Sequence, residues 1–245
     1  MDNRVLRIGV IAPPANVALE RELPRYLPDG VVTNHNRLSR PEARLTRESL
    51  LEMGESVVRA ASDLAYARPD VVMYGCTSGS FLDGFGNEAK VADRITALIG
   101  VPAFTTSSAV LEALRALAAR RVFMVTPYPD EVNEHELGFL AHHGFEVPAW
   151  DSFRCAVSEE IKAITSDEVA ALVLRNRDGI ADCDAVFVSC TNLLVMDRIE
   201  ALEAELGKPL VTSNQASLWA ALRRLGVDTR NIACGRLFRS GPPPA

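Results

Sequence analysis

The feature that most constrains this chain is an internal repeat. Residues 7–16 ("RIGVIAPPAN") align with residues 121–130 ("RVFMVTPYPD"), and each segment is an apolar run that ends in prolines. Farther along, residues 102–117 align with residues 209–224 without a gap. Matches in separate segments at nearly constant spacing are hard to produce by chance, and they indicate a duplicated structural unit. The sequence therefore predicts two lobes of the same architecture, related by a pseudo-two-fold axis.

The domain boundary should fall between the two copies. We expect an N-terminal lobe over residues 1–118 and a C-terminal lobe over residues 119–245, with a last helix that can pack back on the first lobe. A chain of 245 residues can form a sizeable apolar core without disulfides. The active site is expected in the cleft between the lobes, because duplicated α/β units present equivalent ends to each other.

Apolar segments predict strands that alternate with helices. The predicted strands are 6–12, 30–35, 70–75, 101–106, 121–127, 185–190 and 209–213. Apolar residues at a 3.6-residue period predict helices at 41–66, 88–99, 108–119, 130–143, 158–176, 196–206 and 215–225. Alternation of this kind indicates βαβ units and parallel sheets. The predicted fold class is α/β, with two Rossmann-like (flavodoxin-like) lobes.

The composition excludes several classes of partner. The net charge of −6 and the pI near 5.3 argue against binding to nucleic acid or to an anionic membrane surface. No apolar run approaches the roughly 18 residues of a spanning helix, and the first residues lack a signal-peptide pattern. The five cysteines show no CxxC spacing, so neither a disulfide framework nor a zinc site is expected. We expect a cytoplasmic protein without cofactor or metal, whose partner is a small molecule.

Two cysteines occupy equivalent strand ends in the two copies. Cys76 follows "VVMYG" and Cys190 follows "AVFVS", at the offset that aligns the first strands of the repeat. If the lobes face each other, one thiol lies on each side of the shared cleft. Backbone N–H groups at such a loop favour the thiolate. We predict that Cys76 and Cys190 are catalytic, and we interpret Cys155, Cys183 and Cys234 as buried apolar fillers.

Polar residues near these strand ends are the predicted substrate ligands, because hydroxyl and backbone N–H donors can hold a carboxylate or a developing oxyanion. Tyr128 follows a strand end directly, whereas Asn16 and Asn214 are also suited to cap a turn or a helix. The predicted substrate-binding residues are Pro14, Asn16, Thr77, Ser78, Tyr128, Thr191, Asn192 and Asn214. The loop before the predicted helix at 41–66, including Leu38 and Leu45, is a further candidate wall of the pocket.

Paired cysteines at equivalent strand ends of two α/β lobes resemble the aspartate/glutamate racemase superfamily of cofactor-independent enzymes. Within it, the chain is most similar to the arylmalonate decarboxylase and maleate cis-trans isomerase family. The segments that carry the resemblance are "GVIAPPAN", "CTSGSF", "RRVFMVTPYPDEVNE", "VSCTNLL" and "GRLF". In the decarboxylase the first loop carries glycine and only the second carries the proton-donating cysteine. Here Cys76 stands at the first position, and Thr191 stands where that enzyme has glycine.

The resemblance implies a set of substrate-binding residues and several possible reactions. By position, Thr77, Ser78, Tyr128, Cys190 and the Thr191 backbone would hold a carboxylate and stabilise an enediolate. The leading hypothesis is a two-cysteine isomerase, similar to maleate isomerases or racemases, that acts on a small carboxylate or dicarboxylate. One alternative is a decarboxylase in which Cys190 alone donates the proton. Another is a non-catalytic carboxylate-binding protein or an accessory protein of ectoine catabolism. A homo-oligomer is compatible with each hypothesis.

Overall fold

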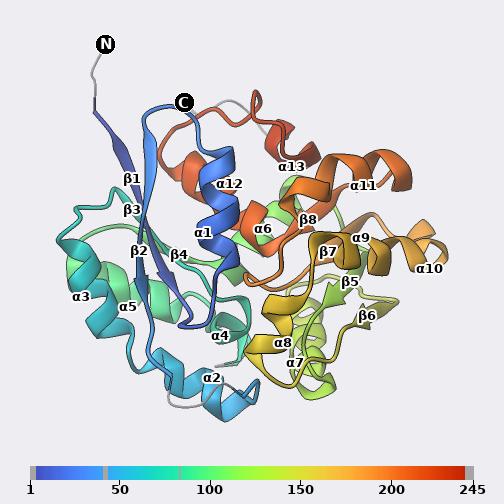
Figure 1. The fold of residues 1–245 in the computed structure, drawn as a ribbon, viewed down its shortest axis with the longest axis horizontal. Coiled ribbons are helices and arrows are strands. Elements are labelled where there is room, and N and C mark those ends of the chain that lie inside the picture. The colour runs from blue at the N-terminus through green and yellow to red at the C-terminus, as the bar shows by residue number, and fades with distance from the viewer. Residues whose placement is uncertain (1–3, 41–43, 83, 241–245) are drawn as a thin grey trace.

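The strands of this protein form two parallel sheets with the same internal order. The computed structural model describes residues 4–40, 44–82 and 84–240 (Figure 1). In the first sheet, ordered β2-β1-β3-β4, the strands are β1 (Leu6–Ala12), β2 (Val31–Arg37), β3 (Val71–Tyr74) and β4 (Ala103–Thr105). In the second sheet, ordered β6-β5-β7-β8, they are β5 (Val122–Thr126), β6 (Trp150–Ser152), β7 (Ala185–Val188) and β8 (Leu210–Thr212). The predicted α/β fold with two parallel-sheet units is confirmed.

Seven of these strands lie where the apolar segments predict them, and β6 was missed. The three residues of β6 are only partly apolar, and they pair with a single neighbour, β5, at the edge of the sheet. An edge strand needs no continuous apolar run, because it is covered on fewer sides than β3 and β7. All four residues of β3 and of β7 are buried. The repeat was the signal that could have located β6, since β2 occupies the equivalent place.

The helices follow the predicted segments with two interruptions. The segment predicted as one helix at 41–66 forms two described helices, and Ser56 lies between them with its hydroxyl bonded to the Met53 carbonyl at 2.9 Å. The segment at 158–176 also divides, because Thr165 is extended and caps the second helix. The longer helices are α2 (Arg47–Gly54), α3 (Val57–Ala65), α5 (Lys90–Ile99), α6 (Thr106–Ala116), α7 (Asp130–His142), α9 (Ser166–Arg175), α11 (Ile199–Leu206) and α12 (Ser213–Arg224). The short ones are α1 (Ala18–Glu22), η1 (Leu23–Tyr26), α4 (Thr77–Phe81), α8 (Ser158–Ala163), α10 (Arg177–Ala181), η2 (Met196–Arg198) and α13 (Gly235–Arg239).

The two halves meet through equivalent helices. Thr105 and Thr212 end equivalent strands, and each caps the following helix by accepting an N–H three residues on. The helices that they begin, α6 and α12, pack against each other between the two sheets (Figure 1). Ser217 on α12 donates to the Thr106 hydroxyl at 3.1 Å. This packing of matching helices is what a pseudo-two-fold axis requires.

The terminal helix α13 lies on the second half of the molecule. It packs against β8, α11 and α12, and Arg239 pairs with Glu200 of α11 at 2.8 Å. The lobe boundary between residues 118 and 119 stays a prediction. Within the described ranges, no helix is long and apolar enough to cross a membrane, and no group of three or more metal-ligating side chains is gathered in one place.

Candidate active site

Cys76 lies where β3 ends and α4 begins. Its backbone is extended, and its thiol caps the helix by accepting the Gly79 N–H at 3.3 Å. The Ser80 hydroxyl donates to the Cys76 carbonyl at 2.8 Å, which fixes the start of the turn. Burial raises the pKa of Cys76, while the Gly79 N–H, the Ser78 hydroxyl and the Arg40 guanidinium act in the opposite direction. The thiol is thus buried and has three neighbours that favour its anion.

Cys190 occupies the equivalent end of β7 with a different backbone. Its φ of +111° is rare for any residue with a Cβ, and such strain concentrates at functional sites. The Cys190 N–H donates to Ser213 Oγ at 3.0 Å, and its thiol accepts the Asn192 N–H at 3.3 Å. Burial raises the pKa of Cys190 to about 12, against the hydrogen bonds from Asn192 and Tyr128. This thiol therefore keeps its proton at neutral pH.

Hydrogen bonds between the halves hold the two cysteine loops together. Thr191 donates to the Gly75 carbonyl at 3.0 Å, and the Asn16 amide donates to Thr191 Oγ1 at 3.0 Å. From the first half, the Thr77 hydroxyl donates to Ser213 Oγ at 2.9 Å. The repeat predicts that the loops face each other, and these bonds show what fixes their separation. The hydroxyls of Thr77 and Thr191 are both used in these bonds between the halves. The backbone N–H of each threonine is therefore the group that can donate to a ligand.

Most of the predicted site residues line one cavity between the halves. Its volume is about 40 Å³, the space of very few water molecules, so the cavity is narrow. The predicted residues in its lining are Asn16, Cys76, Thr77, Ser78, Tyr128, Cys190, Thr191 and Asn192. Both thiols thus border the same space, on opposite halves of the chain.

Two predicted ligands do not line this cavity. The Pro14 carbonyl accepts from Arg37 at 3.3 Å, while its neighbours Pro13 and Ala15 form part of the wall. The Asn214 amide donates to Glu22 Oε2 at 2.6 Å. Because Glu22 is buried, it needs such donors, and Asn214 serves that packing instead of the cavity. The roles of the individual lining residues stay predictions.

Segments from both halves form a cover over the cavity and add residues that the sequence analysis missed. Arg44 pairs with Val157 in an antiparallel bridge, and Arg40 Nη2 donates to Ser158 Oγ at 2.7 Å. This cover contributes Arg40, Leu45, Leu50, Ser158 and Ile161 to the lining. Leu45 was a predicted wall residue and is one of them, whereas Leu38 is not. The sequence match between the halves does not extend to these segments, although α2 and α8 follow the equivalent strands β2 and β6, so the repeat could not identify them.

Arg40 is the cation of this site. Its Nε is buried and has no hydrogen-bond partner among the described residues, although the same guanidinium bonds to Ser158. A buried donor without a partner is costly, and an anionic ligand in the cavity would satisfy it. The cavity therefore combines two thiols, a bed of N–H and hydroxyl donors, one guanidinium and an apolar wall.

Comparison with known proteins places this arrangement in a family. Residues 8–238 match the arylmalonate decarboxylase family. Maleate isomerase from Nocardia farcinica is 30% identical over 244 residues, which cover 96% of each chain. Arylmalonate decarboxylase from Bordetella bronchiseptica is 33% identical over 233 residues, 94% of this chain and 95% of that one.

A solved structure gives the same result. The Nocardia farcinica maleate cis-trans isomerase, as a cysteine-to-serine mutant with a covalently bound succinylcysteine intermediate, superposes with a TM-score of 0.87 at 25% identity. The superposition covers 96% of this chain and 98% of that one. The resemblance inferred from the cysteine loops is thereby confirmed, and the chain belongs to the arylmalonate decarboxylase family.

Proposed function

We propose that this protein is a cofactor-independent cis-trans isomerase of a small unsaturated dicarboxylate such as maleate. The observation that carries the proposal is the pair of thiols, Cys76 and Cys190, which border one narrow cavity from opposite halves. A succinylcysteine adduct is present in the related Nocardia isomerase, and a cysteine that adds to a carbon–carbon double bond produces such an adduct.

The reaction divides between the two thiols according to their surroundings. The Cys76 thiol first loses its proton to solvent. The resulting thiolate attacks one alkene carbon and forms a C–S bond, while the π electrons move to the other alkene carbon and its carboxylate as an enediolate. The Cys190 thiol then donates its proton to the other carbon, which gives a saturated thioether. After rotation about the new single bond, the Cys190 thiolate removes a proton, the C–S bond breaks and the Cys76 thiolate returns. Atoms and charge balance without a cofactor.

Arg40 favours a dicarboxylate over a monocarboxylate. One carboxylate needs donors in the bed around Thr77, Thr191 and Asn192 so that negative charge can develop on it. A second carboxylate would pair with the unpartnered Nε of Arg40. The substrate size is limited by a wall of Leu45, Leu50 and Ile161.

A direct test is a substrate panel of maleate, an aryl malonate and an α-chiral carboxylic acid. We expect conversion of maleate to its trans isomer, detected by proton NMR in deuterated water, with deuterium in the recovered alkene whenever Cys190 exchanges its proton with solvent. Retained ligand binding without any turnover or deuterium exchange would instead support the non-catalytic alternative.

The second candidate is decarboxylation of a malonate. It is favoured by the apolar wall and by the thiol of Cys190, whose pKa of about 12 keeps the donated proton in place. In that reaction Cys76 is dispensable. Conversion of an aryl malonate that is undiminished in Cys76→Ala would replace the isomerase proposal with this one. A cytoplasmic location and a homo-oligomeric state stay predictions, to be checked by fractionation and by light scattering.

A further inference from the structure

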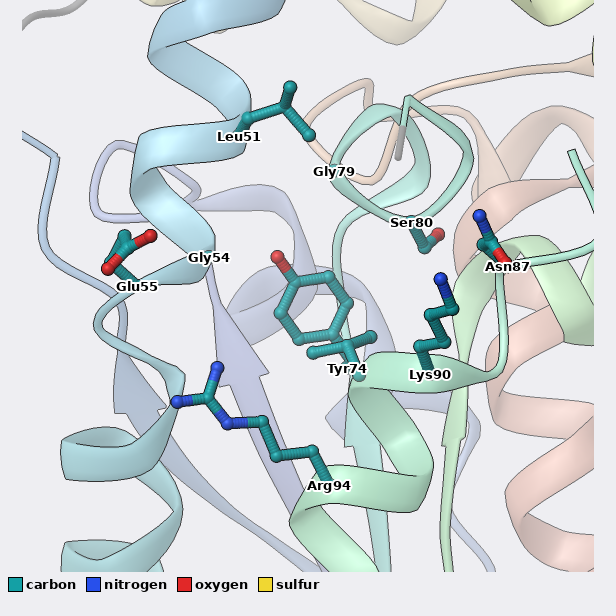
Figure 2. A pocket seen from close by; sticks show the side chains of 10 residues that line it. Leu51, Gly54, Glu55, Tyr74, Gly79, Ser80, Asn87, Lys90 and Arg94 are labelled. Atoms are coloured by element: carbon teal, nitrogen blue, oxygen red, sulfur yellow. The ribbon is translucent and has the colours of Figure 1, made fainter. Parts of the chain in front are cut away.

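A second cavity lies behind the helix that carries Cys76. Its volume is about 300 Å³, and it is formed by α2, the end of β3, α4 and the N-terminal half of α5 (Figure 2). Its lining is Leu51, Gly54, Glu55, Tyr74, Gly79, Ser80, Asn87, Lys90, Val91 and Arg94. Only Gly79 and Ser80 belong to α4, and none of these residues lines the cavity between the two thiols. The pocket is therefore a separate site.

Two cations of this pocket have no carboxylate partner. Lys90 and Arg94 lie one turn apart on α5, and Figure 2 shows their side chains on either side of the Tyr74 ring. In the described part of the chain neither of them forms an ion pair or a side-chain hydrogen bond. Glu55 is the one described carboxylate in the lining, so two positive charges face one negative charge. This balance favours an anionic ligand.

The Tyr74 side chain is buried, and its hydroxyl faces the pocket. Tyr74 is 1% exposed, and its hydroxyl points into the pocket in Figure 2. Over the described ranges, no protein group hydrogen-bonds to it. Because this hydroxyl borders the pocket, a ligand bound there can accept its hydrogen bond in place of water. The Tyr74 hydroxyl, Lys90 and Arg94 border the same space, and the apolar side chains of Leu51 and Val91 lie beside it.

One glycine separates this pocket from the Cys76 thiol. A Cβ at Gly79 would lie 2.9 Å from Cys76 Sγ and 3.0 Å from the Tyr74 hydroxyl. The Gly79 N–H is also the backbone donor to that thiol. A charge bound at Tyr74 therefore acts on Cys76 across a short distance with no side chain between them. A nearby anion disfavours a thiolate.

We propose that this pocket binds a small organic anion, a carboxylate or a phosphate, and that its occupancy slows the reactions of Cys76. Lys90 and Arg94 hold the anionic group, the Tyr74 hydroxyl donates to it, and Leu51 with Val91 covers its apolar part. This site is distinct from the cavity of the proposed reaction.

Calorimetry with inorganic phosphate and with propionate tests the binding, because propionate lacks the second carboxylate that Arg40 would hold in the other cavity. The pocket variant is Lys90→Gln/Arg94→Gln, and the matched control is Arg120→Gln/Lys208→Gln, which removes the same charge from the other half of the chain. We expect at least one probe to bind the wild type and the control alike, and to bind the pocket variant about tenfold more weakly or worse. Preference for phosphate or for propionate identifies the anionic group. No binding by either probe, or equal affinity in all three proteins, overturns the site.

Two single variants sharpen this result. Tyr74→Phe should weaken binding by a smaller factor, about two- to tenfold, without lowering the thermal unfolding temperature, because the lost hydroxyl has no partner in the protein. Glu55→Gln should strengthen binding, since it removes the competing carboxylate. Weaker binding in Glu55→Gln would contradict the assignment of an anion.

Alkylation by iodoacetamide tests the coupling to Cys76, with the modified peptide quantified by mass spectrometry. A saturating probe should slow modification of Cys76 at least about twofold in the wild type and control, and leave the pocket variant unchanged. An unchanged rate with the probe bound overturns the coupling. Neither experiment measures turnover, so failure of this proposal and failure of the proposed isomerase reaction are separate outcomes.

Discussion

The loops at Cys76 and Cys190 begin from equivalent strands but end in different structures. The first continues into α4, so that its thiol caps a helix with ordinary extended backbone. The second turns sharply at a φ of +111°, and its thiol accepts an N–H from only two residues ahead. Duplication thus supplied two thiols in the same place, and the residues after each thiol changed its surroundings.

The charged groups beside the two thiols also differ. Arg40 approaches Cys76 and favours the thiolate. Among the described residues no guanidinium acts on Cys190 in this way, and burial, the largest cause, raises the pKa of this thiol. The comparison shows that a symmetric pair of cysteines can have different surroundings, and on this difference the proposed reaction assigns Cys76 as the nucleophile and Cys190 as the acid.

Serine substitutions give the largest expected effect. Cys76→Ser and Cys190→Ser should each lower the rate of maleate isomerisation by about a thousandfold or more, because each thiol takes part in bond making or proton transfer. The comparison predicts that only Cys190→Ser accumulates a covalent adduct, since it retains the nucleophile. Intact-protein mass spectrometry after incubation with maleate detects that adduct. An adduct on Cys76→Ser would reverse the assigned roles.

Replacement of Arg40 should have the next largest effect. Arg40→Gln is expected to raise KM for a dicarboxylate about tenfold, because the second carboxylate loses its charged partner. Arg40→Lys should recover part of this loss. The pH dependence of Cys76 alkylation should also move to higher pH in Arg40→Gln, since the guanidinium holds down the pKa of this thiol. If Cys190 alkylation moved equally, Arg40 would not distinguish the two loops.

The repeat explains how much of this site could be predicted from the sequence. It located Cys76 and Cys190, and the polar residues beside them, because equivalent strand ends of parallel sheets face a common cleft. It could not locate Arg40 or Ile161, since the sequence match between the two halves does not extend over the segments that cover the cavity. Their positions depend on a bridge between Arg44 and Val157, residues far apart in the sequence.

The secondary structure shows the same difference between features that local sequence predicts and features that depend on distant contacts. Buried runs such as β3 are recognised by composition alone, whereas β6 is a short edge strand that only its neighbour defines. Glu136 was missed for a related reason. In a helical pattern Glu136 is an ordinary charged residue. Only the tertiary structure shows that it is buried, where α7 packs against α4 and Ser189, just after β7, donates to it.

A smaller effect on stability should follow from Glu136. Burial raises the pKa of Glu136 to about 8, and the Ser189 hydroxyl donates to its Oε1 at 2.6 Å. The folded state therefore binds this proton more tightly than the unfolded chain, whose pKa is 4.5. Its contribution to stability is full below that value and is lost as the pH rises through about 8. Glu136→Gln should lack this loss, and denaturant unfolding at several pH values measures it. Parallel pH profiles for the variant and the wild type would contradict the shift.

Glycine substitutions test the backbone difference between the loops, and their effects should be the smallest. At position 190 the positive φ is easy for glycine, so Cys190→Gly should be more stable to unfolding than Cys190→Ala by about 1 kcal/mol. At position 76 the φ of −142° is ordinary, so Cys76→Gly should be less stable than Cys76→Ala, by about 0.5–1 kcal/mol. Both pairs remove the thiol, so the opposite signs report the backbone alone, measured by urea unfolding of all four variants. The same sign at both positions would mean that the strain at Cys190 is absent in solution, and the loops would then differ only in the charges around their thiols.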